Sequence, residues 1–183
     1  MRLLVQRVLR ASVRVGEERV AAMGPGLLCL VGFGAQDGPD LPATALWGNM
    51  LDKLLNLRVF PDILLPGDAE ALARSPEALL AARGLADKMQ RSVGDIGGEV
   101  LLVPQFTLYA NCARGRRPDF TQAAPPDVAA ALFARCVADV ASRLQRPPHQ
   151  GVFAAAMQVS LCNWGPVTIL LDSDALYGAA TPV

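Results

Sequence analysis

The stretch GPGLLCLVGF, residues 24–33, decides the fold class. After the Gly-Pro-Gly turn, residues 27–33 form a continuous apolar run of strand length, which is typical of a strand buried on both faces. The segments before it, residues 2–8, 12–15 and 19–23, mix β-branched and polar residues as strands do. The sequence therefore predicts an antiparallel opening that leads into a buried strand.

Two amphipathic helices are predicted on the C-terminal side of this strand. Apolar residues recur at helical spacing within residues 43–57, with Asp52 and Lys53 on the outer side. A second helix begins at Pro125-Pro126-Asp127, carries apolar residues along one face as far as Leu144, and stops at Pro147-Pro148. We expect both helices to pack on the sheet.

Further strands are predicted in the second half of the chain. Residues 99–103 form a strand that ends at Pro104, because proline cannot donate to a β-ladder. Residues 156–161 and 167–171 are expected to form a hairpin with residues 162–166 at its tip.

Composition narrows the class of protein. A chain of 183 residues with 52% hydrophobic content fits one domain with one core. Lys plus Arg and Asp plus Glu number 17 each, so the net charge gives no sign of general nucleic-acid binding. No window reaches the roughly 18 apolar residues of a membrane helix, and the N-terminus lacks the apolar core of a signal peptide. We therefore expect a soluble cytoplasmic protein with no membrane partner.

The residues on which most hydrolases depend are missing from the sequence. The one histidine, His149, adjoins Pro147-Pro148 in a predicted exposed loop and has no acid or cysteine at a spacing that pairs with it, which disfavours a Ser-His-Asp or Cys-His site. The four cysteines are far apart, so we expect free thiols and neither a metal site nor a disulfide framework. A hydrolase can still work when backbone N–H groups hold the carbonyl oxygen of the substrate.

Two short segments, each at the end of an apolar run, resemble the signatures of the D-aminoacyl-tRNA deacylase family. VPQFTLYA, residues 103–110, resembles the active-site motif Ser-Gln-x-x-Leu, and NWGPVT, residues 163–168, resembles the Gly-cisPro motif. The resemblance covers nearly the whole chain, because further matches follow in the family's order at residues 6–8, 11–13, 24–27, 56–60, 97–99 and 115–118. Residues 63–85 and 174–183 lie outside it.

The resemblance implies a fold and an assembly. It implies a single α/β domain over residues 1–183, whose mixed, mostly antiparallel sheet forms a partly open barrel with two main packed helices. Residues 63–85 are interpreted as an exposed loop insertion, or alternatively as a contact to the body of the tRNA, and residues 174–183 as an unmatched tail. The implied assembly is a homodimer that binds the 3′ end of an aminoacyl-tRNA without a cofactor.

The resemblance also implies a reaction, the hydrolysis of the ester of D-aminoacyl-tRNA. Main-chain atoms would orient the ester, and the 2′-hydroxyl of the terminal adenosine would assist the attacking water. Gln105, Phe106 and Thr107 would line the ester and adenosine pocket. We expect Thr107 to position the substrate, because no base lies near it in sequence to activate its hydroxyl.

The second motif would act as a chiral filter in the active site of the neighbouring subunit. The carbonyl groups of Gly165 and Pro166 would bind the amino group of the substrate and clash with an L side chain, so glycine mischarged on tRNA would also be a substrate. Arg7 matches an arginine that braces this motif in the family. Arg116 and Arg117 are expected either to meet a phosphate of the acceptor end or to form a solvated basic turn.

The chain departs from the family pattern at Pro104, which replaces the usual serine. Proline at this position resembles a branch with relaxed specificity that also acts on L-alanyl-tRNA, whereas Phe106, the Gln6-Arg7 pair and residues 115–118 resemble the D-specific branch. Three alternatives thus stay open: relaxed specificity, an esterase of small D-amino-acid derivatives, and a non-catalytic protein that binds tRNA ends.

Overall fold

The computed structural model describes residues 1–62, 64–65, 67–83 and 88–178. Its main sheet has six strands in the order β2-β1-β3-β6-β7, with β8 paired to the other side of β1. β1 pairs antiparallel with β2, β3 and β8, and β6 runs parallel to β3 and β7, so the predicted mixed, mostly antiparallel sheet is confirmed. The strands are β1 (Arg2–Val15), β2 (Glu18–Met23), β3 (Gly26–Gly32), β6 (Glu99–Pro104), β7 (His149–Gln150) and β8 (Met157–Asp172).

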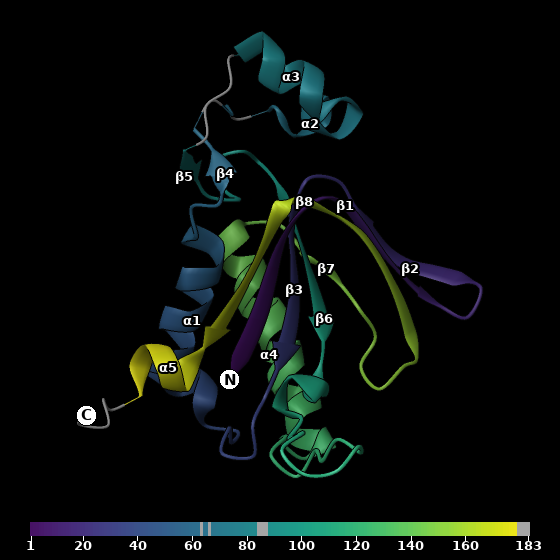
Figure 1. The fold of residues 1–183 in the computed structure, drawn as a ribbon. Helices are drawn as coiled ribbons and strands as arrows, with labels where there is room; N and C mark the ends of the chain where they lie inside the picture. Colours follow the sequence, from purple (N-terminus) through teal and green to yellow (C-terminus); the bar gives the residue numbers. More distant parts are fainter. Residues whose placement is uncertain (63, 66, 84–87, 179–183) are drawn as a thin grey trace.

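The length of β1 curls the sheet into a partly open barrel. Its first half, residues 2–8, pairs with β3, and its second half, residues 11–15, pairs with β2. β8 accompanies both halves. The part formed by β2, residues 11–15 and residues 157–162, here called the wing, extends away from the other strands (Figure 1).

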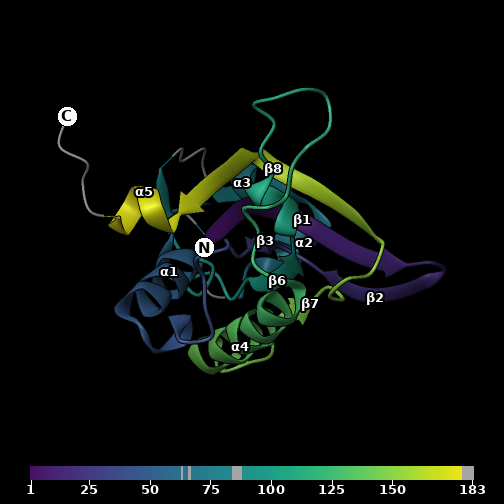
Figure 2. The ribbon, with the colours of Figure 1, turned by 90° about the horizontal axis from the view of Figure 1, so that it is seen from below.

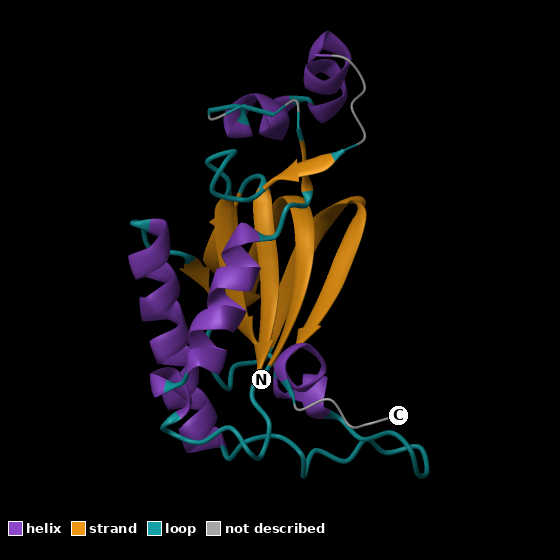
Figure 3. Ribbon diagram, turned by 90° about the vertical axis from the view of Figure 1, so that its left-hand side faces the viewer, coloured by secondary structure: helices purple, strands orange, loops and turns teal. Residues whose placement is uncertain are grey.

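Two long helices cover one face of the sheet and enclose the main core. They are α1 (Ala45–Asn56) and α4 (Pro126–Leu144), close to their predicted bounds, and they lie beside the sheet in Figure 3. Thr44 caps α1 by accepting a hydrogen bond from the N–H of Trp47, as Thr commonly does at a helix start. The Trp47 ring N–H donates to Asp139 at 2.8 Å and so joins α1 to α4.

The strand β3 is buried on both faces, as predicted. Its Leu27, Cys29 and Val31 belong to the core beneath the helices. Leu28 lies on the opposite face in a second cluster. That cluster is completed by Val8 in the first half of β1 and by buried residues of the wing and of β6, namely Ala11, Val13, Ala21, Met23, Leu101 and Val103.

The predicted hairpin over residues 156–171 is wrong. β8 is one strand that runs along β1 through Met157–Asp172, and it bulges where the hairpin tip was expected. Gln6 pairs with Thr168 and Val8 with Asn163, so residues 164–167 all stand opposite Arg7. The Asn163 side chain closes this bulge, because it accepts from the Val167 N–H at 2.8 Å and donates to the Thr168 hydroxyl at 2.9 Å. The chain therefore resumes its direction instead of reversing.

The segment between α1 and β6 builds a small structure beyond one end of the sheet (Figure 1). It contains β4 (Phe60–Pro61), α2 (Ala69–Arg74), α3 (Pro76–Arg83) and β5 (Met89–Arg91), with β4 and β5 paired. Leu64 and Leu72 are fully buried in the main core. The interpretation of residues 63–85 as an insertion stays a prediction; residues 63, 66 and 84–85 of that stretch lie outside the described residues.

The N-terminus packs against the start of α5. Two short 3-10 helices complete the fold: η1 (Leu41–Ala43) leads into α1, and η2 (Phe106–Tyr109) follows β6. The short helix α5 (Ser173–Tyr177) follows β8. The N–H of Ser173 donates to the carbonyl of Met1 at 3.0 Å. Of the tail beyond α5, residues 179–183 lie outside the described part. No helix within the described residues is long and apolar enough to cross a membrane.

Candidate active site

The first motif forms a tight turn at the end of β6. Pro104 is the last residue of β6, the Gln105 N–H donates to the Val31 carbonyl at 2.7 Å, and the chain then enters η2. Gly32 permits this close approach, since a Cβ atom there would lie 2.8 Å from the Gln105 carbonyl oxygen. We call residues 104–109 the site turn.

The site turn leaves two backbone donors free. The first N–H groups of any helical turn lack a partner within it. Those of Phe106 and Thr107 donate no hydrogen bond to any described residue. Both residues are exposed, so the two donors belong to the solvent-facing part of the site turn.

The side chains of the turn offer no nucleophile with a base. The Gln105 amide donates to the Thr107 hydroxyl, and within the described residues that hydroxyl contacts no imidazole, amine or carboxylate. Phe106 is 54% exposed and packs edge-on against Phe120, with ring centroids 5.0 Å apart. The geometry therefore agrees with the positioning role expected for Thr107, and the roles of all three residues stay predictions.

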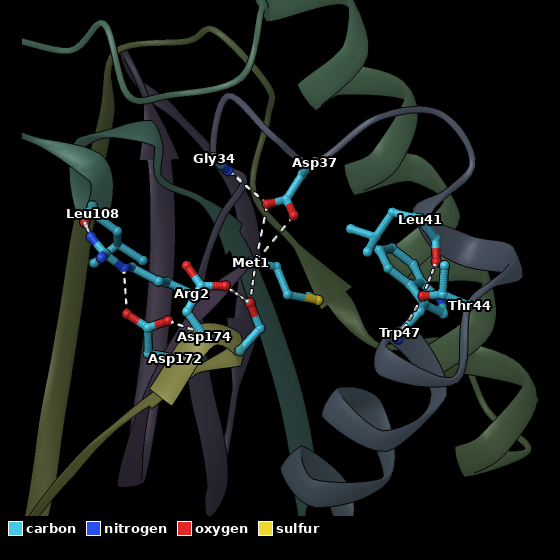
Figure 4. Close-up of polar contacts among 11 residues, drawn as sticks. Met1, Arg2, Gly34, Asp37, Leu41, Thr44, Trp47, Leu108, Asp172 and Asp174 are labelled. Atoms are coloured by element: carbon cyan, nitrogen blue, oxygen red, sulfur yellow. Dashed lines mark hydrogen bonds and ion pairs between the residues drawn. The ribbon is translucent and has the colours of Figure 1, made fainter. Parts of the chain in front are cut away.

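Arg2 anchors the far end of the site turn (Figure 4). Its guanidinium donates to the Leu108 carbonyl at 2.9 Å and to Asp172 at 2.8 Å, and it lies 4.4 Å from the centre of the Tyr109 ring. Burial raises the pKa of the Tyr109 hydroxyl well above its ordinary value. Although burial works in the opposite direction, hydrogen bonds from the Asp174 N–H and from Arg2 hold the pKa of Asp172 below its ordinary value.

A second group of contacts supports this anchor from the N-terminus. The Met1 amine lies 3.0 Å from an Asp37 oxygen and donates to the Ser173 hydroxyl at 2.7 Å. Asp37 also accepts from the Gly34 N–H at 2.7 Å. Sequence reasoning missed Arg2, Asp37 and Asp172, because up to 170 residues separate these partners along the chain and no local pattern links them.

The second motif is presented by Arg7. The peptide bond between Gly165 and Pro166 is cis, and both residues are exposed. Arg7 is only 7% exposed, donates to the Trp164 carbonyl at 2.8 Å, and lies 4.4 Å from the centre of the Trp164 ring. It also donates to the Val59 carbonyl.

Arg7 leaves no room for a side chain at residue 165. Gly165 has φ +128°, and a Cβ atom there would lie 2.6 Å from the Arg7 guanidinium. Burial lowers the pKa of Arg7, and in the described part of the chain no carboxylate pairs with it. The contacts are those expected of a brace.

One chain does not bring the two motifs together. Arg7, beside the second motif, pairs with Leu27 at the start of β3, whereas Pro104 pairs with Val31 near its end. Four residues of a strand span about 13 Å. Gly165 and Pro166 therefore lie near the opposite end of the sheet from Gln105, Phe106 and Thr107.

A basic loop follows the site turn. Asn111 and Asp119 exchange two backbone hydrogen bonds of 2.7 and 2.9 Å and so close the loop between them. Its Arg114, Arg116 and Arg117 are exposed and make no ion pair with any described residue. Figure 2 shows this loop on the far side of the sheet from α1 and α4.

The expectation that His149 lies in an exposed loop is wrong. His149 belongs to β7, because the edge of β6 pairs with it, and its Nε2 atom lies 2.9 Å from a Glu99 oxygen. Glu99 also accepts from the Gly24 N–H at 2.6 Å. The four cysteines are free, and within the described residues no group of three or more His, Cys, Asp or Glu side chains could hold a metal ion.

Comparison with solved structures gives the class of fold first. The structure is similar to that of the c-Myc DNA Unwinding Element Binding Protein, with a TM-score of 0.72 and 34% sequence identity, covering 94% of this chain and 98% of that one. A probable eukaryotic D-amino acid tRNA deacylase shares the fold at a TM-score of 0.69 and 18% identity, covering 93% and 97% of the two chains.

The sequence then identifies the family. The model of the D-Tyr-tRNA(Tyr) deacylase family matches residues 4–172, which include both motifs, so the chain belongs to that family. It is 49% identical over 181 residues to a D-aminoacyl-tRNA deacylase of Nitratidesulfovibrio vulgaris strain DP4, covering 99% of this chain and 98% of the relative. A D-aminoacyl-tRNA deacylase of Desulfovibrio desulfuricans is 46% identical over 179 residues, covering 98% and 100%. The resemblance noted in the sequence and the predicted class of fold are thus confirmed.

Proposed function

We propose that this protein hydrolyses the ester of D-aminoacyl-tRNA, and of glycine mischarged on tRNA, and releases free tRNA and the amino acid. The observation that carries the proposal is the site turn, whose two free backbone N–H groups belong to exposed residues at a strand end that Gly32 and Arg2 hold in place. Donors fixed in this way can stabilise the oxyanion that forms when an ester is attacked. Relatives of nearly equal length are named for this activity.

The proposed step needs no side-chain nucleophile. The substrate carbonyl oxygen accepts hydrogen bonds from the N–H groups of Phe106 and Thr107. Water forms a bond to the carbonyl carbon with help from the 2′-hydroxyl of the terminal adenosine, the ester C–O bond breaks, and the 3′ oxygen takes up the proton that water loses. Gln105 fixes Thr107 beside the carbonyl, and the exposed rings of Phe106 and Phe120 offer faces on which the adenine can stack.

A homodimer would bring the second motif to this site. Because the two motifs lie near opposite ends of the sheet, a two-fold axis across the strands would bring Gly165 and Pro166 of one subunit to the site turn of its partner. The face of β8 that the helices leave uncovered carries exposed apolar side chains, with Leu170 54% and Val159 36% exposed. A partner subunit would bury these side chains, and the carbonyls of the second motif would then reject L side chains.

Pro104 marks where the specificity could depart from a strict filter. Proline has no backbone N–H, but this removes neither free donor of the site turn, because those two N–H groups belong to Phe106 and Thr107. We therefore propose D-aminoacyl esters as the substrates, with hydrolysis of L-alanyl-tRNA as the alternative. Aminoacyl-tRNA is a cytoplasmic substrate, so the proposal places the protein in the cytoplasm.

The deciding experiment follows the release of amino acid from D-tyrosyl-tRNA, L-tyrosyl-tRNA and L-alanyl-tRNA at micromolar or lower protein. Loss of the D-ester alone is expected. Additional loss of L-alanine would assign the relaxed specificity, and no turnover of any ester would leave the non-catalytic binding function. A D-ester on tRNA that ends in 2′-deoxyadenosine separates this enzyme from a general esterase, because only the esterase would hydrolyse it at an undiminished rate.

A further inference from the structure

The wing carries a hollow that the proposed reaction does not use. It has a volume of about 390 Å³ and lies among β1, β2 and β8. No carboxylate lines it; the lining residues are Arg10, Ala11, Ser12, Arg19, Ala22, Met23, Ser160 and Leu161.

Strand register explains why its polar groups converge. Side chains alternate between the faces of a strand, so Arg10 and Ser12 share the face of β1 opposite to the buried Ala11 and Val13. Ser12 pairs with Ser160 of β8. Arg19 enters from β2, where it pairs with Arg14. Two guanidinium groups and two hydroxyl groups therefore border one hollow.

None of these polar groups has a partner in the described part of the chain. Arg10 and Arg19 make no ion pair or hydrogen bond through their side chains, and the hydroxyls of Ser12 and Ser160 make none either. Glu17 is directed to Arg14 instead, at 3.8 Å. Like charges on one face of a sheet repel each other, so a bound anion would stabilise this arrangement.

We propose that the hollow binds a phosphate group of the RNA backbone in the acceptor stem of the tRNA. This inference rests on the proposed function and assigns the hollow to the same substrate. Ser160 precedes Gly165 by five residues, which span at most about 17 Å of strand. When the second motif enters the partner's site, the hollow therefore lies close to the ester, where the acceptor strand continues. Arginine and serine contacts to phosphate position the RNA without reading its sequence.

The test separates backbone binding from chemistry. We would measure kcat and KM on D-tyrosyl-tRNA for Arg10→Ala, Arg19→Ala and the double variant. Lys53→Ala is the matched control, since it removes an exposed cation from α1 on the helix side of the sheet. The double variant should raise KM roughly tenfold with kcat unchanged, and each arginine removed should lower the salt slope of kcat/KM by about one. Hydrolysis of D-tyrosyl-adenosine, which lacks the neighbouring phosphates, should not change.

Several results would overturn the inference. An unchanged KM and salt slope, or equal losses on both substrates, would do so. A third result would also overturn it: inorganic phosphate inhibits the wild type competitively but not the double variant, while the double variant keeps its KM for the tRNA ester. The hollow would then bind free phosphate and not the RNA. If the wild-type protein hydrolyses no ester, filter binding of uncharged tRNA still decides: weaker binding by the double variant supports the site, and equal binding rejects it.

Discussion

Among single residues, Arg7 departs from what its type prefers, because an arginine is seldom buried unless it is paired, and no carboxylate among the described residues pairs with it. The buried guanidinium of Arg7 donates hydrogen bonds to two carbonyl groups, those of Trp164 and Val59, and stacks on the indole ring of Trp164. Lysine keeps the charge but has neither the planar fork nor the stacking face. Arg7→Lys should therefore loosen the second motif, and the ratio of kcat/KM for D-tyrosyl-tRNA over L-tyrosyl-tRNA should fall. Arg135→Lys, on the exposed face of α4, is the control, and an unchanged ratio with a normal melting curve would contradict the brace.

Thr107 gives a second prediction at the scale of single residues. Its hydroxyl accepts from the Gln105 amide and has no base beside it in the described part of the chain. Thr107→Val should therefore keep kcat within about threefold of the wild-type value, whereas removing a true nucleophile costs thousandfold or more. Single-turnover release of D-tyrosine measures the difference, and a loss of three orders of magnitude would make Thr107 the nucleophile.

At the scale of elements, η2 is held by strands that are far from it in sequence. Arg2 at the start of β1 bonds to the last turn of η2 and to Asp172 at the end of β8. Arg2→Ala should lower kcat about tenfold through loss of a charge-assisted hydrogen bond, with a smaller effect on KM. Asp172→Asn keeps the cap of α5 but not the charge, so its kcat should fall less. A pure loss of thermal stability, with kcat at 25 °C unchanged in both variants, would show that the anchor does not position the site turn.

Glu99 joins β6 to β7 through His149 and to the turn before β3 through the Gly24 N–H. Its carboxylate should make the stability of the fold depend on pH. Although burial alone would raise it, the pKa of Glu99 lies below its ordinary value because His149 and the Gly24 N–H bond to the carboxylate. Because the pKa is lower in the folded state, the Glu99 contacts stabilise the fold fully above the unfolded pKa, about 4.3. This stabilisation is lost as the pH falls through the folded pKa. Both side chains are more than a third exposed, so the contribution should stay below about 1 kcal/mol. Urea unfolding of Glu99→Gln should show a flatter stability profile below pH 5 than the wild type, and an identical profile would exclude this linkage.

At the scale of the whole molecule, D-selectivity should require two chains. The uncovered apolar face of β8 and the separation of the two motifs point to the same two-fold partner. Leu170→Asp places a charge on that face, so it should yield a monomer by sedimentation velocity and lose D-selectivity. Ala138→Asp adds the same charge to the exposed side of α4 and should change neither property. A Leu170→Asp protein that stays dimeric would move the interface elsewhere.

The sequence alone determined the local features of this protein. The apolar run after Gly26, the helical periodicities of α1 and α4, and the two motifs are all patterns within a few residues, so composition and spacing suffice to find them. They predict the class of fold, and the motifs indicate the family. His149 and the supposed hairpin were misjudged because a strand partner from elsewhere in the chain, β6 or β1, set their conformation.

Only the tertiary structure decided where these features lie with respect to one another. The pairing of Arg7 with the start of β3 and of Pro104 with its end separates the two motifs within one chain. The same folding brings Arg2 to Leu108, 106 residues away, and gathers Arg10, Arg19 and Ser160 around one hollow. The physical reason is that strand register and side-chain contacts join residues far apart along the chain, while periodicity and turn chemistry act only between near neighbours.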